Sequence, residues 1–221
     1  MIKYLLPIIV IVCVGLLADT VFFPKTRSVA AESPLPGWDK VKDAGATPAQ
    51  VNESTAVFDS DGKMKLPTGY RAWVFVGAPL TPNALNDGEA NFPEYHHVYC
   101  EKKNVDAYLK TGTFPEGTVF VKELTRVLDP KFPDGSRTEP SGRGYFNGEY
   151  NGIDLTIKDS KRFAKTNNWG FFTFGHHPLP YNKTADERPV TECAGCHIAN
   201  VAQTDMTWIQ FYPLLRDKKG Y

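Results

Sequence analysis

From Phe58 onward, short apolar runs alternate with turn signals built on glycine, proline and aspartate, such as Ser60-Asp61-Gly62 and Pro133-Asp134-Gly135. Short apolar runs bounded by such residues are typical of β-strands joined by tight turns. The pattern predicts six strands, at residues 71–77, 95–100, 118–128, 144–150, 153–158 and 169–174. Five or six strands of this length suffice for an antiparallel sheet.

Helical periodicity is weaker than the strand pattern. It favours helices at residues 104–111, 158–166 and 205–215, the last with Asp205 as its N-cap. Together the two patterns predict an α+β, mainly β fold: an antiparallel sheet with a few short helices.

One predicted strand has a mixed pattern on each of its faces. Period-2 alternation places Phe120, Lys122 and Leu124 on one face and Val119, Val121 and Glu123 on the other. A lysine between two large apolar residues either extends to solvent at a sheet edge or has a specific function. Alternation alone favours the solvent-exposed edge.

The N-terminus has the pattern of an export signal. Lys3 precedes an apolar run over residues 5–18, and the small residues Ser28-Val29-Ala30-Ala31 follow it. Cleavage after Ala30 fits this pattern, and an uncleaved membrane anchor over residues 4–23 is the alternative. Either way, we expect the rest of the chain to be periplasmic or otherwise extracytoplasmic.

The domain organisation follows from these patterns. Residues 1–31 are predicted to be the signal peptide or N-terminal membrane anchor, residues 32–56 a linker or arm rich in proline and glycine, and residues 57–221 one folded domain. The 221 residues are 42% hydrophobic and 23% charged, which supports a folded core. Basic and acidic residues balance at 25 each without a basic patch, so nucleic acid is not an expected partner.

The most specific motif is Cys193-Ala194-Gly195-Cys196-His197. Two thiols at this spacing can bond the two vinyl groups of one haem, and the following histidine can then bind the iron as axial ligand. A zinc site would need a second thiol pair, whereas Cys13 and Cys100 are isolated. A redox disulfide and a structural bridge are the remaining alternatives, and the motif favours covalent haem c.

Several other segments carry a resemblance to a known family. They include Lys65-Leu66-Pro67-x-x-Tyr70-Arg71-x-Trp73, Thr118-Val119-x-Val121-Lys122-Glu123-Leu124, Gly144-Tyr145-Phe146-x-Gly148, Glu192-Cys193-Ala194-x-Cys196-His197 and Thr204-Asp205-Met206. The sequence from Phe58 to Leu215 resembles the cytochrome P-460 family, exported c-type haem proteins that oxidise hydroxylamine.

The resemblance implies a specific role for Lys122. In that family the lysine of the Val-Lys-Glu-Leu segment bonds its side-chain nitrogen to a meso carbon of the porphyrin, and by position this residue is Lys122. The resemblance thus implies one haem c held by Cys193, Cys196 and Lys122, with His197 on the iron and the opposite coordination position open. It also implies a homodimer, and the chemistry requires an electron acceptor such as a soluble cytochrome.

The implied reaction is oxidation of hydroxylamine to nitric oxide or nitrous oxide, and it requires a base near the iron. Candidate bases are His96 and His97, whose pKa suits neutral pH, and Asp186 and Glu187 in the loop before the haem motif. A solvated surface position is an equally good interpretation of each. His96 stands where family members carry an arginine, so the sequence leaves the product open.

Two other functions remain alternatives. Related β-type c-prime cytochromes share the architecture, bind nitric oxide without catalysis and lack the lysine bond. An electron-transfer cytochrome would need a second strong axial ligand, and neither Met64 nor Met206 is a persuasive one. The match at Lys122 favours the hydroxylamine-oxidising enzyme over both.

Overall fold

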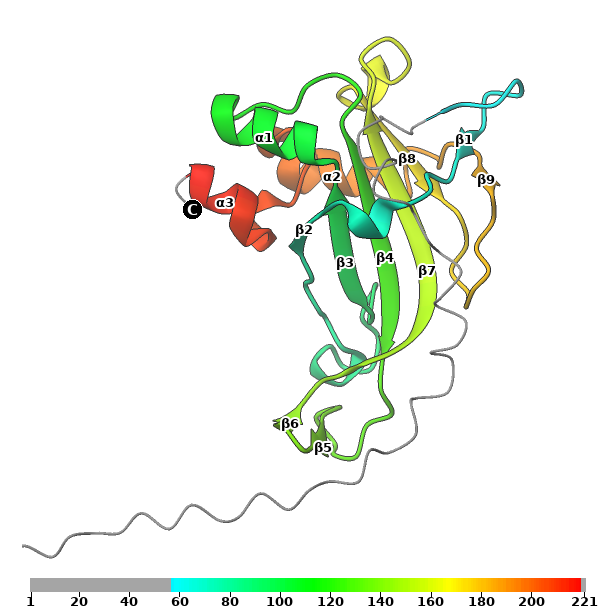
Figure 1. Ribbon diagram of the computed structural model, residues 1–221. Coiled ribbons are helices and arrows are strands. Elements are labelled where there is room, and N and C mark those ends of the chain that lie inside the picture. The colour runs from blue at the N-terminus through cyan, green and yellow to red at the C-terminus, as the bar shows by residue number, and fades with distance from the viewer. Residues whose placement is uncertain (1–56, 220–221) are drawn as a thin grey trace, which may run out of the picture. The chain divides into compact units, whose positions relative to one another are not determined.

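A computed structural model of the chain describes residues 57–219 (Figure 1). The predicted signal peptide or anchor and the predicted linker, residues 1–56, lie outside the described residues. Within residues 57–219, no helix is both long enough and apolar enough to cross a membrane.

The fold is built on one antiparallel sheet of five strands, which confirms the predicted α+β, mainly β class. In spatial order the strands are β2 (Val74–Gly77), β3 (Tyr95–Cys100), β4 (Val119–Val127), β7 (Asn147–Lys158) and β8 (Trp169–Thr173). Two small ribbons accompany this sheet. They pair β1 (Met64–Lys65) with β9 (Thr184–Ala185) and β5 (Arg137–Glu139) with β6 (Gly142–Gly144).

Helices in the described residues are short. The three α-helices are α1 (Lys102–Thr111), α2 (Ala194–Val201) and α3 (Pro213–Lys219). The 3-10 helices are η3 (Tyr70–Ala72), η4 (Asn83–Leu85), η5 (Ala164–Thr166), η6 (Ala202–Thr204) and η7 (Ile209–Phe211). Figure 1 shows α1, α2 and α3 gathered beside one end of the five-stranded sheet, with β5 and β6 at the other end.

Strand alternation gives the sheet two buried faces. The face that we call the helical face carries Val98, Phe120 and Phe171, which cluster with Ala194 of α2, Ile209 of η7 and Leu215 of α3. The opposite face carries Val121, Leu155 and Phe172, which cluster with Met64 and Tyr70. Alternate residues of one strand face different clusters. The position of a residue in its strand therefore determines the face of the sheet on which its side chain lies.

Two predicted strands are one strand in the structure. Residues 144–150 and 153–158 were separated at Asn151-Gly152, but β7 runs through this dipeptide. Thr125 pairs with Tyr150 while Leu124 pairs with Gly152, so Asn151 is an extra residue in a β-bulge. The turn-forming residues therefore mark an irregularity within a strand and not its end.

The prediction of a helix at residues 158–166 is wrong. Residue 158 ends β7, and only the 3-10 turn η5 forms beyond it. The carboxylate of Asp159 accepts hydrogen bonds from the backbone N–H groups of Lys161 and Arg162, both at 3.0 Å. A side chain that binds the backbone in this way stabilises a turn in competition with a helix.

The predicted helix at residues 205–215 is also corrected. Asp205 is not an N-cap: it ends η6 with a left-handed φ of 54°. The segment then forms η7, and α3 begins at Pro213. Proline suits the first position of a helix because its missing N–H has no partner there. Helix α2, which contains the haem motif, was not predicted.

Gly77 allows the C-terminal segment to lie against the sheet edge. A Cβ atom at this position would lie 2.8 Å from the carbonyl oxygen of Phe211 and 2.9 Å from the ring of Tyr212. Glycine therefore permits η7 to pack directly on β2.

Candidate haem site

The Cys-x-x-Cys-His motif forms the start of α2. Cys193 is the N-cap residue, and Cys196 and His197 lie in the helix that follows. The side chain of Cys193 is half-buried and that of Cys196 is exposed, and both are free thiols. Burial, followed by the nearby Asp154 carboxylate, raises the pKa of the Cys193 thiol.

The imidazole of His197 is held in one orientation by the backbone. Its Nδ1 lies 2.7 Å from the carbonyl oxygen of Met206, which can only accept, so Nδ1 carries the proton and Nε2 carries the lone pair. Met206 and the preceding Asp205 have left-handed φ angles of 60° and 54°. Burial lowers the pKa of His197 and thus favours the neutral form that binds metals.

Aromatic rings flank this imidazole on two sides. The ring of Phe171 on β8 lies edge-on with its centroid 4.7 Å away, and that of Trp208 lies 5.7 Å away. The indole N–H of Trp208 also donates to Nε2 at 3.3 Å. A bond from Nε2 to a metal would take the place of this hydrogen bond.

A second group of side chains surrounds Lys122 on the helical face. Lys122 Nζ lies 2.9 Å from an Asp154 carboxylate oxygen, and His176 Nε2 lies 3.1 Å from the other. The ammonium also lies 4.5 Å from the centroid of the Phe92 ring, which in turn contacts His96 edge-on. We call these five residues, Phe92, His96, Lys122, Asp154 and His176, the Lys122 cluster.

Strand register explains how the Lys122 cluster forms. Lys122 on β4 is directly opposite Asp154 on β7, and Val98 on β3 is directly opposite Lys122 on its other side. His96 is two residues from Val98 and therefore shares its face. The three central strands thus bring a cation, a carboxylate and an imidazole to one face.

Electrostatic interactions link the Lys122 cluster to the haem motif. The charges of Asp154 and Lys122 both act on the pKa of Cys193, and the charge of Lys122 also acts on that of His197. Such interactions require proximity because Coulomb energies fall with distance. Lys122 and Asp154 therefore lie near Cys193 and His197, although the two pairs are far apart in the sequence.

The titratable groups of the cluster are strongly perturbed. Burial alone would raise the pKa of Asp154, but the charges of Lys122 and His176 outweigh burial and hold it below its ordinary value. The hydrogen bond to Asp154 raises the pKa of His176. Burial, followed by the Lys122 charge, lowers the pKa of His96 to about 4, so His96 is neutral at pH 7. Its Nε2 is buried with no hydrogen-bond partner among residues 57–219.

Comparison with known families adds the deciding observation. The sequence matches the family described as Cytochrome P460 over residues 67–209, more than half of the chain, and the match spans both Lys122 and the haem motif. The chain belongs to the cytochrome P460 family. It is therefore a haem protein of the cytochrome class. No curated protein matches the sequence significantly.

The side chains fit the haem that membership of the cytochrome P460 family implies. His197 presents a neutral nitrogen whose tautomer is fixed by the Met206 carbonyl oxygen, and it follows two cysteines at the sequence spacing of a covalent haem motif. Phe171 and Trp208 supply apolar surface for a flat macrocycle. The buried, unpartnered Nε2 of His96 is a polar atom that a ligand could satisfy.

Three of the predicted base candidates lie elsewhere. His97 faces the other side of the sheet, where its Nε2 lies 3.0 Å from Thr125 Oγ1 and 2.9 Å from Asn147 Oδ1. Asp186 pairs with Lys63 at 2.8 Å. Glu187 pairs with Phe172 of β8 on the opposite face. The structure brings His96, but not these three residues, to the Lys122 cluster.

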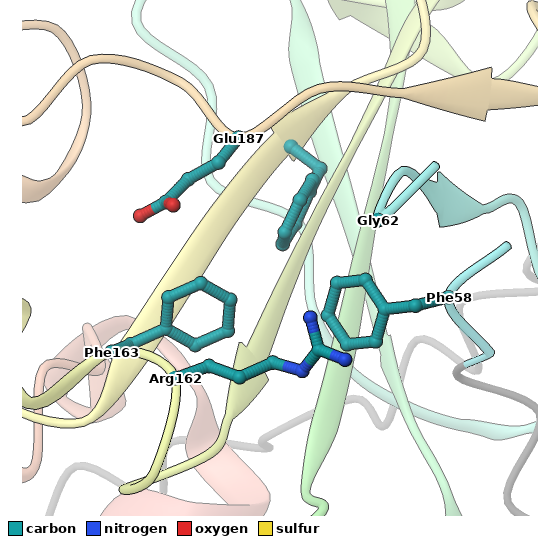
Figure 2. A pocket seen from close by; sticks show the side chains of 6 residues that line it. Phe58, Gly62, Arg162, Phe163 and Glu187 are labelled. Atoms are coloured by element: carbon teal, nitrogen blue, oxygen red, sulfur yellow. The ribbon is translucent and has the colours of Figure 1, made fainter. Parts of the chain in front are cut away.

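Glu187 belongs to a separate pocket of about 220 Å³, shown in Figure 2. The Arg162 guanidinium crosses it above the Phe58 ring, 4.0 Å from the centroid. The lining residues are Phe58, Gly62, Arg162, Phe163, Phe172 and Glu187. The pocket lies on the opposite face from His197, so its residues do not contribute to the haem site.

The structure also shows the surroundings of both methionines of the described residues. Met64 is fully buried on the opposite face. Met206 presents its carbonyl oxygen to His197 Nδ1, while its sulfur lies 3.5 Å from Asn167 Nδ2. Neither side chain is placed in the Lys122 cluster.

Asp154, His176, Phe171 and Trp208 were missed by sequence reasoning. Asp154 interrupts the run Ile153-Asp154-Leu155-Thr156-Ile157, where alternation places the aspartate on the face opposite the three aliphatic residues. This alternation could have identified Asp154 from the sequence. It could not have shown that Asp154 pairs with Lys122, because that pairing depends on a register shifted by the bulge in β7.

Proposed function

We propose that the protein is an exported c-type haem enzyme that oxidises hydroxylamine to nitric oxide or nitrous oxide. In this proposal one haem is bonded to Cys193 and Cys196, His197 binds its iron, and the Lys122 nitrogen is bonded to a porphyrin carbon. The observation that carries the proposal is the position of Lys122, which lies on the helical face in the middle of the sheet and whose charge acts on the pKa values of Cys193 and His197.

The place of β4 in the sheet supports a specific role for Lys122. Because β4 has strands on both sides, Lys122 is not at a sheet edge, and its side chain is only 27% exposed. A lysine with an ordinary solvating role buries its methylene stem and keeps its ammonium in water. Lys122 instead lies beside an aromatic ring and a carboxylate.

The chain would hold the cofactor from two directions. Helix α2 supplies two thiols and the imidazole, and strand β4 supplies the lysine nitrogen. The bound haem supplies an iron that accepts electrons from the substrate nitrogen. Phe171 and Trp208 shield the His197 side of the site from water.

Asp154 and His176 provide a path for the released protons. Oxidation of hydroxylamine frees protons at the nitrogen, and a nearby base must accept them. Asp154 is mostly buried in the Lys122 cluster, whereas His176 is 46% exposed and bonded to the same carboxylate. Protons accepted by Asp154 can thus pass through His176 to solvent.

The lysine bond would also change the basicity of Asp154. In the free chain, the Lys122 ammonium is one of the groups that hold the pKa of Asp154 down. A nitrogen bonded to the porphyrin carries no such charge, so one cause that lowers the pKa of Asp154 is lost and that pKa rises, while His176 still lowers it. A base is most effective when its pKa is near the working pH. Bonding Lys122 therefore converts its ion-pair partner into a better proton acceptor.

One observation supports a second candidate, an electron-transfer cytochrome. His96 is neutral and its Nε2 has no hydrogen-bond partner within the described residues, so it could serve as a second protein ligand to the iron. Two strong axial ligands give a low-spin iron that does not bind substrate. The visible and electron paramagnetic resonance spectra of the resting protein separate the two candidates, since the enzyme requires a high-spin, five-coordinate iron.

The enzymatic proposal is tested with Lys122→Leu and the matched variant Lys131→Leu, which removes an exposed lysine of the segment between β4 and β5. Hydroxylamine consumption is measured with a small one-electron dye as acceptor, alongside the visible spectrum. We expect Lys122→Leu to change the spectrum and abolish turnover, and Lys131→Leu to do neither. An unchanged spectrum and unchanged turnover in Lys122→Leu would disprove the proposal.

A further inference from the structure

His96 carries a hydrogen-bond acceptor that no other group of residues 57–219 satisfies. Its Nε2 is buried without a partner, so the hydrogen bond between its ring and the backbone of Phe92 is made by the other nitrogen, Nδ1. Because this bond raises the pKa of His96, Nδ1 donates to the Phe92 carbonyl oxygen. A neutral imidazole with its proton on Nδ1 has a lone pair on Nε2. The ring thus presents a buried acceptor.

The surroundings of His96 hold the ring in this orientation. Its backbone is paired with Leu124 of β4, and its backbone N–H donates to the Pro79 carbonyl oxygen at 3.0 Å. The Phe92 carbonyl oxygen also accepts a hydrogen bond from the Thr81 hydroxyl at 2.7 Å, and the Phe92 ring lies edge-on to the imidazole with centroids 5.7 Å apart. The Nε2 acceptor is therefore preorganised, and a donor that binds it does not have to order the side chain.

The ring of His96 is suited to binding a donor and not to removing a proton. Burial, followed by the charge of Lys122, lowers the pKa of His96 to about 4. Burial is the larger cause and does not depend on the charge of Lys122, so it still lowers this pKa when Lys122 is bonded to the porphyrin. A base with so low a pKa holds a proton poorly at neutral pH. His96 therefore remains a neutral acceptor there.

His96 lies where a small molecule at the haem could reach it. It shares the helical face with Lys122, and the charge of Lys122 acts on the pKa values of His96, Cys193 and His197 alike. An iron porphyrin has no N–H groups, and its ionised propionates only accept hydrogen bonds. A donor to Nε2 must therefore come from a small molecule bound in the site.

We propose that His96 is a specificity determinant whose Nε2 accepts a hydrogen bond from an N–H or O–H group of the substrate at the haem. Hydroxylamine carries hydrogen on both its nitrogen and its oxygen, whereas nitric oxide and nitrous oxide carry none. His96 therefore favours binding of the substrate over binding of either product by one hydrogen bond. The inference rests on the proposed function and names its substrate class: small nitrogen compounds that carry N–H or O–H groups.

The test compares a ligand that can donate with one that cannot. The dissociation constants of hydroxylamine and nitric oxide are measured by absorbance on the ferric, haem-loaded protein without an electron acceptor. Their ratio is independent of any water molecule that both ligands displace. We expect His96→Leu to weaken hydroxylamine binding about tenfold relative to nitric oxide binding, the effect of one lost hydrogen bond.

Two further variants separate the acceptor from the general effect of a mutation. The matched control is His97→Leu, the same change at the next residue, whose side chain lies on the other face of the sheet. We expect it to leave the ratio unchanged. His96→Gln places an amide oxygen, also an acceptor, near the position of Nε2 and should recover most of the lost preference. Should His96→Leu fail to bind haem, His96→Phe takes its place with the same expectation.

An unchanged ratio in His96→Leu, or equal shifts in His96→Leu and His97→Leu, would overturn the proposal. A low-spin electron paramagnetic resonance signal that becomes high-spin in His96→Leu would also overturn it, because His96 would then bind the iron itself. These measurements require binding but no turnover. If the protein binds hydroxylamine with the expected preference but does not oxidise it, only the proposed function fails. If it oxidises hydroxylamine and His96→Leu leaves the ratio unchanged, only this inference fails.

Discussion

At the scale of single residues, the Lys122–Asp154 pair is the most informative contact in the chain. A mostly buried ion pair contributes little net stability, since desolvation offsets the attraction. In the proposed function this pair has a chemical role beside the haem motif: Lys122 would supply a nitrogen, and Asp154 would accept protons.

The first prediction concerns Asp154 as the proton acceptor. Asp154→Asn keeps the size of the side chain but removes the base, so we expect kcat for hydroxylamine oxidation to fall about 100-fold, as is typical of general-base loss. Steady-state kinetics on the haem-loaded protein measure this, with haem content verified by absorbance. Asp129→Asn, at an exposed position, is the control. Equal kcat values for wild type and Asp154→Asn would contradict the assignment.

A second prediction concerns stability and pH at His176. Its folded-state pKa is raised above the ordinary 6.5 by Asp154, so its charge stabilises the fold below that pH. The contribution is lost as pH rises through the folded-state pKa. We expect His176→Gln to be less stable than wild type near pH 5.5 and nearly equal to it near pH 9. Urea unfolding followed by circular dichroism measures the difference. A stability gap that widens with rising pH would contradict this sign.

Residues of the site differ in how far sequence alone could identify them. The haem motif is local, and its spacing alone indicates covalent haem at Cys193, Cys196 and His197. Lys122 is recognisable as a charged residue between two apolar residues on one face of its strand. Asp154 acquires its role only through a cross-strand partner, and His176 only through Asp154. His97 and Glu187 were plausible by residue type, but strand alternation places both on the opposite face.

At the scale of elements, the turn between η6 and η7 fixes the proximal side of the site. Asp205 joins three segments: its carboxylate lies 2.6 Å from Lys158 Nζ on β7 and 3.0 Å from the Trp169 indole nitrogen on β8. The next residue, Met206, supplies the carbonyl oxygen that orients His197. The orientation of the His197 imidazole thus depends on an ion pair outside the haem motif.

The third prediction follows from this arrangement. Asp205→Ala leaves Lys158, whose side chain is only 11% exposed, without its carboxylate, so we expect a loss of about 3 kcal/mol in the free energy of unfolding. The control is Asp217→Ala, which removes a carboxylate that is 76% exposed. For that variant we expect a change of less than about 1 kcal/mol. Denaturant titration compares both with wild type, and equal effects would contradict the account.

Element prediction succeeded where the signal was local and periodic. Strands β3, β4 and β8 and helix α1 lie close to their predicted ranges. The errors at 158–166 and 205–215 arise where side chains of Asp159 and Asp205 bind other groups and hold the backbone in turns. Helix α2 escaped prediction because its eight residues are fewer than the window over which helical periodicity can be recognised.

At the scale of the whole molecule, the sheet separates two environments. Its helical face gathers the haem motif and the Lys122 cluster, while the opposite face carries an ordinary core and the pocket lined by Arg162 and Glu187. The residues of the proposed haem site thus lie on one side of the sheet. The homodimer and the soluble cytochrome acceptor stay predictions from the resemblance.

A fourth prediction concerns export. Covalent haem attachment of this type takes place outside the cytoplasm, so a chain lacking residues 1–31 should accumulate without covalent haem. Haem staining of denaturing gels detects thioether-bound haem directly. The full chain should stain, and the shortened chain should not. Equal staining of both would contradict an export role for the N-terminal segment.

The central claim is that one haem is bonded to the chain at three points. Peptide mapping of the matured protein by mass spectrometry, after measurement of its intact mass, tests this most directly. The account predicts a single haem that links the peptide containing Cys193 and Cys196 to the peptide containing Lys122. A haem attached to the cysteine peptide alone, with Lys122 unmodified, would contradict it.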